Sequence, residues 1–232
     1  MVCHGILVHR FLMAGENGYI LVGAFLNDED LLMDGFAAYH IDTDTWYRFA
    51  DGVGLGEKYH ICIAQKESWV AVCDEESNVK VYDMTTDTCL AEFSLRMPAN
   101  AVSQILLVND RYLAAKTTDG RVLIHDLLSG ELLYNKLLEG YPNGKLGAVL
   151  DEENARLYLW DDNDYGDDGY CVDTGSWTEL TTINGLFWFD AQHKEAYRSV
   201  YDYEAGGRTI CACHVPTLDE LIRAGRGLLA QP

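Results

Sequence analysis

Short apolar runs separated by polar turns recur along the whole chain, and they predict antiparallel strands. In one stretch, apolar runs at 59–64, 69–73, 79–82 and 89–93 alternate with charged turns such as Gln65-Lys66-Glu67-Ser68. Runs of this length that are rich in Val, Ile, Tyr, Phe and Trp, and bounded by Asn, Asp, Gly and Ser, are typical of strands joined by hairpins. The pattern therefore predicts a four-stranded antiparallel sheet in this stretch.

The same arrangement repeats with a period slightly above forty residues. An apolar strand runs into an aspartate at Asp42, Asp83, Asp126 and Asp173, and successive aspartates are 41, 43 and 47 residues apart. A period in the forties with four strands per repeat is the signature of β-propeller blades. We expect an all-β chain: a β-propeller of about five blade-like four-stranded antiparallel sheets, with a short C-terminal α-helix. The propeller would span residues 1–216, with repeats at about 5–50, 59–95, 101–140, 145–183 and 186–214.

The fifth repeat departs from this pattern. It offers three strands, at 186–190, 196–201 and 208–213, and His214 falls 41 residues after Asp173, where the next turn is due. Pro216 follows, and Thr217 with Glu220 forms a capping-box pattern that predicts a helix to about residue 229, within a helix and tail at 217–232.

Strand 208–213 would then lack a fourth strand, and Met1 to His4 is too short to supply an extra outer strand. An exposed edge of this kind invites pairing with another strand. We expect the C-terminal helix to cover it, or another chain or a preceding region to complete the ring.

The repeated aspartates have a structural explanation. A carboxylate at Asp42, Asp83, Asp126 or Asp173 can accept backbone N–H groups of the turn between the third and fourth strands, and the Thr or Ser that follows can add a second local bond. Gly130 and Gly175 can supply positive φ in these turns. The aspartates are therefore interpreted as hairpin residues rather than as a catalytic set.

At these positions the chain resembles WD-repeat and related quinoprotein-like β-propellers. The Trp-Asp dipeptide of that pattern is represented by Ile41-Asp42, Tyr82-Asp83, His125-Asp126 and Val172-Asp173, whereas the literal pair Trp160-Asp161 lies on a second strand. The resemblance implies a scaffold for protein–protein contacts.

The net charge is −20, from 17 Lys and Arg against 37 Asp and Glu. Nucleic acids and anionic membranes need a basic surface, so neither is an expected partner, whereas a protein with a basic surface is. The seven cysteines form no Cys-x-x-Cys pair, and no apolar run approaches the roughly 20 residues that span a membrane. These features predict a cytoplasmic protein with reduced thiols.

An acidic loop at 161–168 is the densest polar cluster, with Asp161, Asp162, Asp164, Tyr165, Asp167 and Asp168 as candidate binding residues. Carboxylates around a glycine can wrap calcium, but Tyr165 occupies the third ligand position of an EF-hand loop and Val172 the twelfth. The alternative is a solvated acidic loop. A zinc site at Cys211, Cys213 and His214 is disfavoured because the histidine would point to the opposite face of a strand from the cysteines.

No nucleophile elbow, Walker loop or His-Glu-x-x-His motif is present. We therefore expect a non-enzymatic interaction scaffold with no cofactor, and no catalytic residues are assigned. A calcium-dependent propeller enzyme, such as a lactonase-like hydrolase, remains the alternative. A third possibility is a structural subunit or a receptor domain that belongs to a longer protein.

Overall fold

The computed structural model describes residues 2–3, 6–14, 17–25, 35–49, 62–138, 144–162, 168–204, 206–217, 220 and 223. These residues form twenty strands in five antiparallel sheets, and neighbouring strands in each sheet follow the order of the chain. The chain divides into two compact units, Met1–Lys136 and Leu137–Pro232. The all-β, propeller-like class predicted from the sequence is confirmed.

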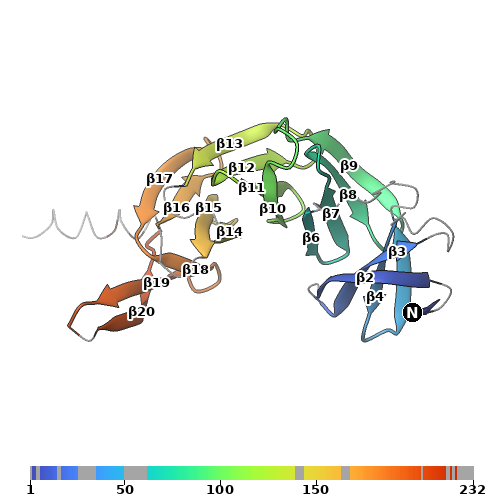
Figure 1. Cartoon of the computed structure of the whole chain (residues 1–232). Helices are drawn as coiled ribbons and strands as arrows, with labels where there is room; N and C mark the ends of the chain where they lie inside the picture. Colours follow the sequence, from blue (N-terminus) through green and yellow to red (C-terminus); the bar gives the residue numbers. More distant parts are fainter. Residues whose placement is uncertain are drawn as a thin grey trace, which may run out of the picture. The chain divides into compact units, whose positions relative to one another are not determined.

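The first unit contains three sheets (Figure 1). The first sheet consists of β1 (Val2–Cys3), β2 (Ile6–Ala14), β3 (Tyr19–Phe25), β4 (Gly35–His40) and β5 (Thr45–Phe49). The second consists of β6 (Cys62–Lys66), β7 (Trp69–Cys73), β8 (Asn78–Asp83) and β9 (Thr88–Ser94), and the third of β10 (Val102–Leu107), β11 (Tyr112–Thr117), β12 (Arg121–Asp126) and β13 (Leu132–Leu137).

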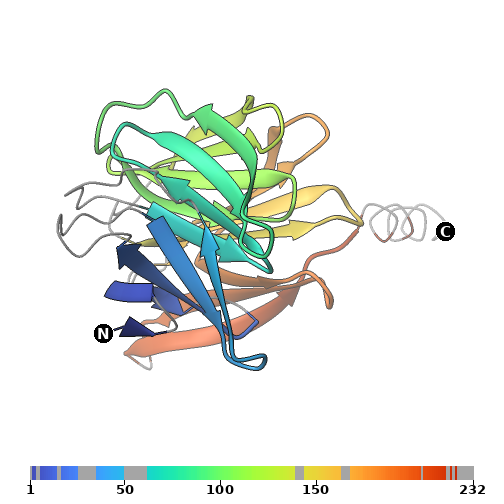
Figure 2. The same cartoon turned by 90° about the vertical axis from the view of Figure 1, so that its right-hand side faces the viewer.

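The second unit contains the other two sheets, whose strands are seen from a second direction in Figure 2. The fourth sheet consists of β14 (Lys145–Asp151), β15 (Arg156–Asp162), β16 (Gly169–Asp173) and β17 (Thr178–Ile183). The fifth consists of β18 (Leu186–Asp190), β19 (Glu195–Asp202) and β20 (Gly207–His214). The prediction that the fifth repeat has three strands is confirmed for the described residues.

Two sequence-based expectations need correction or stay open. The short strand β1 pairs with β2, so the first sheet has five strands rather than four, although the extra strand lies beside the first strand of the repeat and not beside the fourth. At the predicted helix, Thr217 N donates to Glu220 Oε2 at 2.7 Å and Glu220 N donates to Thr217 Oγ1 at 3.2 Å, which is the expected capping box. The rest of that helix, apart from Glu220 and Arg223, lies outside the described residues.

Adjacent sheets within each unit pack face to face through apolar side chains. In the first unit, Phe36 and Ala38 pack against Val70 of the second sheet. In the second unit, Cys171 of the fourth sheet shares a core cluster with Leu186 of the fifth. Gly169 permits this close approach, because a Cβ atom there would lie 2.6 Å from the Leu186 Cβ. Burial of a large side chain such as Phe36 or Leu186 stabilises the fold by about 1.5–3 kcal/mol.

Along the part of the chain that the structure describes, no helix combines the length and apolar character needed to cross a membrane.

Candidate interaction surface

One backbone hydrogen bond recurs in all five sheets and defines which residues are equivalent. The residue that follows each third strand donates its N–H to a carbonyl in the first hairpin of the same sheet, over 2.8–2.9 Å. The five pairs are Ile41 with Gly18, Met84 with Ser68, Leu127 with Arg111, Thr174 with Ala155, and Val215 with Lys194. The equivalent ends of the third strands are therefore His40, Asp83, Asp126, Asp173 and His214.

The aspartates at three of these ends accept hydrogen bonds from their own turns. Asp83 accepts from Thr85 N at 2.9 Å, Asp126 from Ser129 N at 3.0 Å, and Asp173 from Ser176 Oγ at 2.6 Å. Hydrogen bonds from Ser129 hold the pKa of the Asp126 carboxyl below its usual value, and those from Ser176 do the same for Asp173. These carboxylates are engaged in local turn structure.

In the first repeat the predicted turn aspartate is displaced by two residues. His40, not Asp42, ends the third strand, and the Thr43 N–H lies 3.3 Å from His40 Nδ1. The position four residues after each strand end has positive φ in the first four sheets, at Asp44, Asp87, Gly130 and Trp177. Gly175 is therefore not the positive-φ residue of its turn, contrary to the sequence-based expectation, whereas Gly130 is.

The acidic segment is only partly a loop. Asp161 and Asp162 belong to β15, and Asp161 is buried at 5% exposure, so it is not part of a solvated loop. Asp168 is half-buried just before β16, and Asp164, Tyr165 and Asp167 lie outside the described residues. The described residues contain no group of three or more His, Cys, Asp or Glu side chains that could hold a metal ion.

The cysteines behave as ordinary thiols. Cys211 and Cys213 face Arg198 and Ala196 across the β19–β20 pair, whereas His214 faces Glu195 on the other side of the sheet, as strand alternation predicted. Free thiols are present at Cys62, Cys73, Cys89, Cys171, Cys211 and Cys213, and burial raises the pKa of Cys73 to about 12.

The fifth sheet differs from the other four at two core positions. Four residues before the strand end, Phe36, Val79 and Val122 are 0–1% exposed, and Gly169 is buried, but Ile210 is 66% exposed. Two residues before the strand end, Ala38, Val81, Ile124 and Cys171 are 0–2% exposed, but Ala212 is exposed. In the first, second and fourth sheets these positions face the next sheet. The fifth sheet presents the same face uncovered.

Aromatic side chains extend this uncovered surface. Cross-strand register places Tyr197 opposite Ala212 and Tyr201 opposite Arg208, so these residues share one side of the sheet with Ile210. Tyr201 is 48% exposed. We define the fifth-sheet face as Tyr197, Tyr201, Ile210 and Ala212. Trp188 lies at a register shift in β18 and its ring contacts that of Trp160 in the fourth sheet, so it does not belong to this face. On the opposite side, Phe189 and Ala196 contribute to the core with the fourth sheet.

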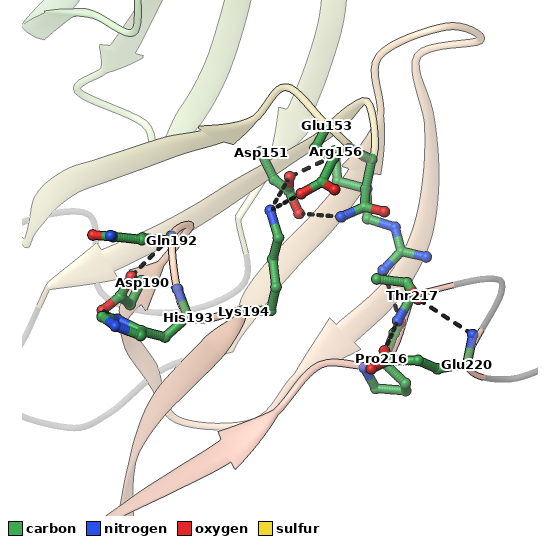
Figure 3. Close-up of polar contacts among 11 residues, drawn as sticks. Asp151, Glu153, Arg156, Asp190, Gln192, His193, Lys194, Pro216, Thr217 and Glu220 are labelled. Atoms are coloured by element: carbon green, nitrogen blue, oxygen red, sulfur yellow. Dashed lines mark hydrogen bonds and ion pairs between the residues drawn. The ribbon is translucent and has the colours of Figure 1, made fainter.

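An ion pair and a hydrogen bond to a backbone carbonyl hold the fifth sheet to the fourth (Figure 3). Lys194 Nζ in the β18–β19 turn lies 2.6 Å from Asp151 Oδ1 at the end of β14, and Arg156 Nη1 donates to the Pro216 carbonyl at 3.1 Å. Sequence reasoning missed Asp151 and Lys194 because they are 43 residues apart. Asp151 and Asp190 each precede a four-residue turn. This pattern could have predicted the two turns from the sequence, but not the ion pair between Asp151 and Lys194.

The outer edge of β20 is the second part of the surface. In the other four sheets a fourth strand, β5, β9, β13 or β17, pairs with the third. Among the described residues, no strand pairs with this edge of β20. A row of backbone donors and acceptors therefore borders the fifth-sheet face.

Comparison with known proteins agrees with this architecture. No protein-family model matches the chain. The WD repeat-containing protein 55 homolog of Dictyostelium discoideum is 33% identical over 67 residues, which cover 29% of this chain and 16% of that protein.

Two solved structures are similar in fold. The computationally designed Ika8 protein has a TM-score of 0.53 at 15% identity, covering 86% of this chain and 56% of that one. A chain of the mitotic checkpoint complex has a TM-score of 0.51 at 14% identity, covering 90% and 65%. The match thus spans less than two thirds of each of these proteins. With the repeated meander sheets, these likenesses show a WD-repeat β-propeller type of fold.

Proposed function

We propose that this protein is a non-enzymatic protein–protein interaction scaffold that binds its partner through the fifth-sheet face and the edge of β20. The observation that carries the proposal is the 66% exposure of Ile210, since the equivalent residues of the other four sheets are buried. An apolar patch that is continuous with an unpaired strand edge is characteristic of an association site. The partner would complete the row of blades in place of a following sheet.

Covering this surface would contribute favourably to binding. Covering the exposed part of Ile210 contributes about 1–2 kcal/mol, and Tyr201 adds aromatic area of the kind that dominates protein interfaces. A strand added to β20 would also satisfy its outward-facing N–H and C=O groups.

The charge of −20 supports a partner with a basic surface. Opposite charges steer diffusional encounter over about a Debye length, roughly 8 Å at physiological ionic strength. The association rate with such a partner would therefore fall as salt rises. The free thiols fit a cytoplasmic scaffold. The acidic surface fits a scaffold that does not bind nucleic acid.

Affinity capture with quantitative mass spectrometry tests the proposal. The wild-type chain is compared with Ile210→Asp and with Leu180→Asp, because Leu180 is an exposed leucine on β17 of the fourth sheet. A captured protein that is lost with Ile210→Asp and retained with Leu180→Asp would support the fifth-sheet face as the binding surface. Equal capture by all three proteins would contradict it.

A further inference from the structure

The geometry of the fifth sheet defines the partner more narrowly. We infer that β20 pairs with an antiparallel strand of a second polypeptide, which places a large apolar residue opposite Ile210 and a threonine opposite His214. This inference rests on the proposed scaffold function and specifies the chemistry of the segment that it binds.

The apolar residue is predicted from the fourth strands that pair with the third strand in other sheets. The position equivalent to Ile210 pairs with a large apolar side chain of the fourth strand wherever the register is defined. The pairs are Phe36 with Phe49, Val79 with Phe93, and Gly169 with Ile183. A residue of this size opposite Ile210 would cover the end of the fifth-sheet face.

The threonine is read in the same way from the end of the third strand. His40 pairs with Thr45, Asp83 with Thr88, and Asp173 with Thr178. The first sheet is the best template, because β4 and β20 share Ala and His at equivalent positions, Ala38 with Ala212 and His40 with His214. The strand bound there is β5, with the sequence Thr-Trp-Tyr-Arg-Phe.

The residues directly after β20 differ from the turns that lead to a fourth strand in other sheets. In the second and third sheets, the N–H of the second turn residue, Thr85 or Leu128, donates to the aspartate that ends the strand. The equivalent residue in the fifth sheet is Pro216, which has no N–H to give.

The described residues after β20 make a different set of hydrogen bonds. The Pro216 carbonyl accepts from Arg156, Thr217 and Glu220 form their reciprocal capping bonds, and Glu220 Oε2 lies 3.2 Å from His214 Nε2. These contacts hold the chain in a helix start rather than in a hairpin. All the described strands already belong to sheets, so a second polypeptide is the occupant that these contacts favour.

A synthetic peptide tests the inference directly. The probe is a labelled peptide with the sequence of residues 44–50, Asp-Thr-Trp-Tyr-Arg-Phe-Ala, added to the full chain and followed by fluorescence anisotropy and amide hydrogen exchange. Saturable binding with slower exchange in β20 is expected. Replacement of the phenylalanine by aspartate in the peptide, or Ile210→Asp in the protein, should weaken binding at least tenfold, as should alternate N-methylation of the peptide backbone. The control variant Leu180→Asp should bind normally.

Other outcomes would overturn the inference in distinguishable ways. If β20 amides are already protected in a monomeric chain without peptide, residues after Thr217 cover the edge. If protection accompanies a dimer in sedimentation, the occupant is a second copy. If no peptide binds and the edge is unprotected, but capture of a partner still depends on Ile210, the scaffold function stands and strand addition fails.

Discussion

The ion pair between Lys194 and Asp151 makes a quantitative test of how the fifth sheet is held to the fourth. The Asp151 side chain is 2% exposed and that of Lys194 is 17% exposed, so the pair is largely removed from water. Asn154 Nδ2 also donates to Asp151 Oδ2, at 2.8 Å. Burial opposes ionisation of Asp151, but the bonds from Lys194 and Asn154 outweigh it and lower the pKa of the carboxyl.

Lys194→Met would leave this buried carboxylate without its cation. Breaking a buried pair in this way costs about 3–5 kcal/mol, so we expect the free energy of unfolding to fall by about 3 kcal/mol at pH 7. Lys80→Met is the matched control, since Lys80 pairs with Glu92 at 3.3 Å but the two side chains are 35% and 61% exposed. An exposed pair of that kind contributes less than about 1 kcal/mol.

The pH dependence fixes the sign of the effect. The lowered pKa of Asp151 stabilises the wild-type protein above the unfolded carboxyl pKa of about 3.9, and this stabilisation is lost as pH falls through the folded pKa. Loss of Lys194 removes part of what lowers the pKa of Asp151, so the carboxyl is protonated at a higher pH in the variant than in the wild type. The difference between wild type and variant should therefore shrink from pH 7 to pH 4.

Urea unfolding followed by tryptophan fluorescence measures this difference, because Trp160 and Trp188 lie in edge contact, 6.1 Å between ring centroids, at the junction of the fourth and fifth sheets. Asp151→Asn combined with Lys194→Met should recover part of the loss. The reasoning would be refuted if Lys194→Met cost no more than Lys80→Met, or if the difference between wild type and Lys194→Met stayed constant with pH.

Four further outcomes are expected. Asp126→Ala should lower the free energy of unfolding by about 1–2 kcal/mol, because the Asp126 carboxylate accepts hydrogen bonds from two turn N–H groups. Asp42→Ala should change the free energy of unfolding by less than about 0.5 kcal/mol. Equal effects of the two substitutions in urea unfolding would contradict the assigned register. Gly169→Ala should cost about 1–3 kcal/mol by overpacking against Leu186, seen as a lower urea midpoint. Burial lowers the pKa of His125, so stability should be fully present above about pH 6.5 and fall at lower pH, and His125→Phe should flatten that slope in thermal melts. Millimolar calcium should leave the melting temperature unchanged, and a rise abolished by Asp162→Asn with Asp164→Asn would instead establish a calcium site.

Much of the strand pattern could be predicted because each hairpin is a local feature. The strand predicted at 69–73 is β7, and those predicted at 79–82 and 186–190 correspond to β8 and β18. Alternating apolar residues and polar turns specify such strands without long-range information. The short strand β1 escaped prediction because two residues carry no periodicity.

The register of the first repeat could not be predicted for a similar reason. The sequence Asp42-Thr43-Asp44-Thr45 offers the Asp-Thr pattern two residues later than the strand end, and local chemistry does not distinguish the two positions. The distinction comes from the bond between Ile41 N and Gly18 O, which joins residues more than twenty positions apart. Local sequence likewise does not distinguish Ile210 from its equivalents in the other sheets, which are buried whereas Ile210 is exposed.

Among the described residues, the turn after β20 differs from the turns after β8 and β12 at one hydrogen-bond donor. In the second and third sheets an aspartate at the strand end and an N–H two residues later close the turn that leads to the fourth strand. In the fifth sheet those two positions are His214 and Pro216, and this bond cannot form. The first sheet also has a histidine at the strand end yet retains its fourth strand, so the histidine alone does not open the sheet. Pro216 thus removes from the fifth repeat the turn bond that the second and third sheets share, and its carbonyl instead accepts a hydrogen bond from Arg156 of the fourth sheet.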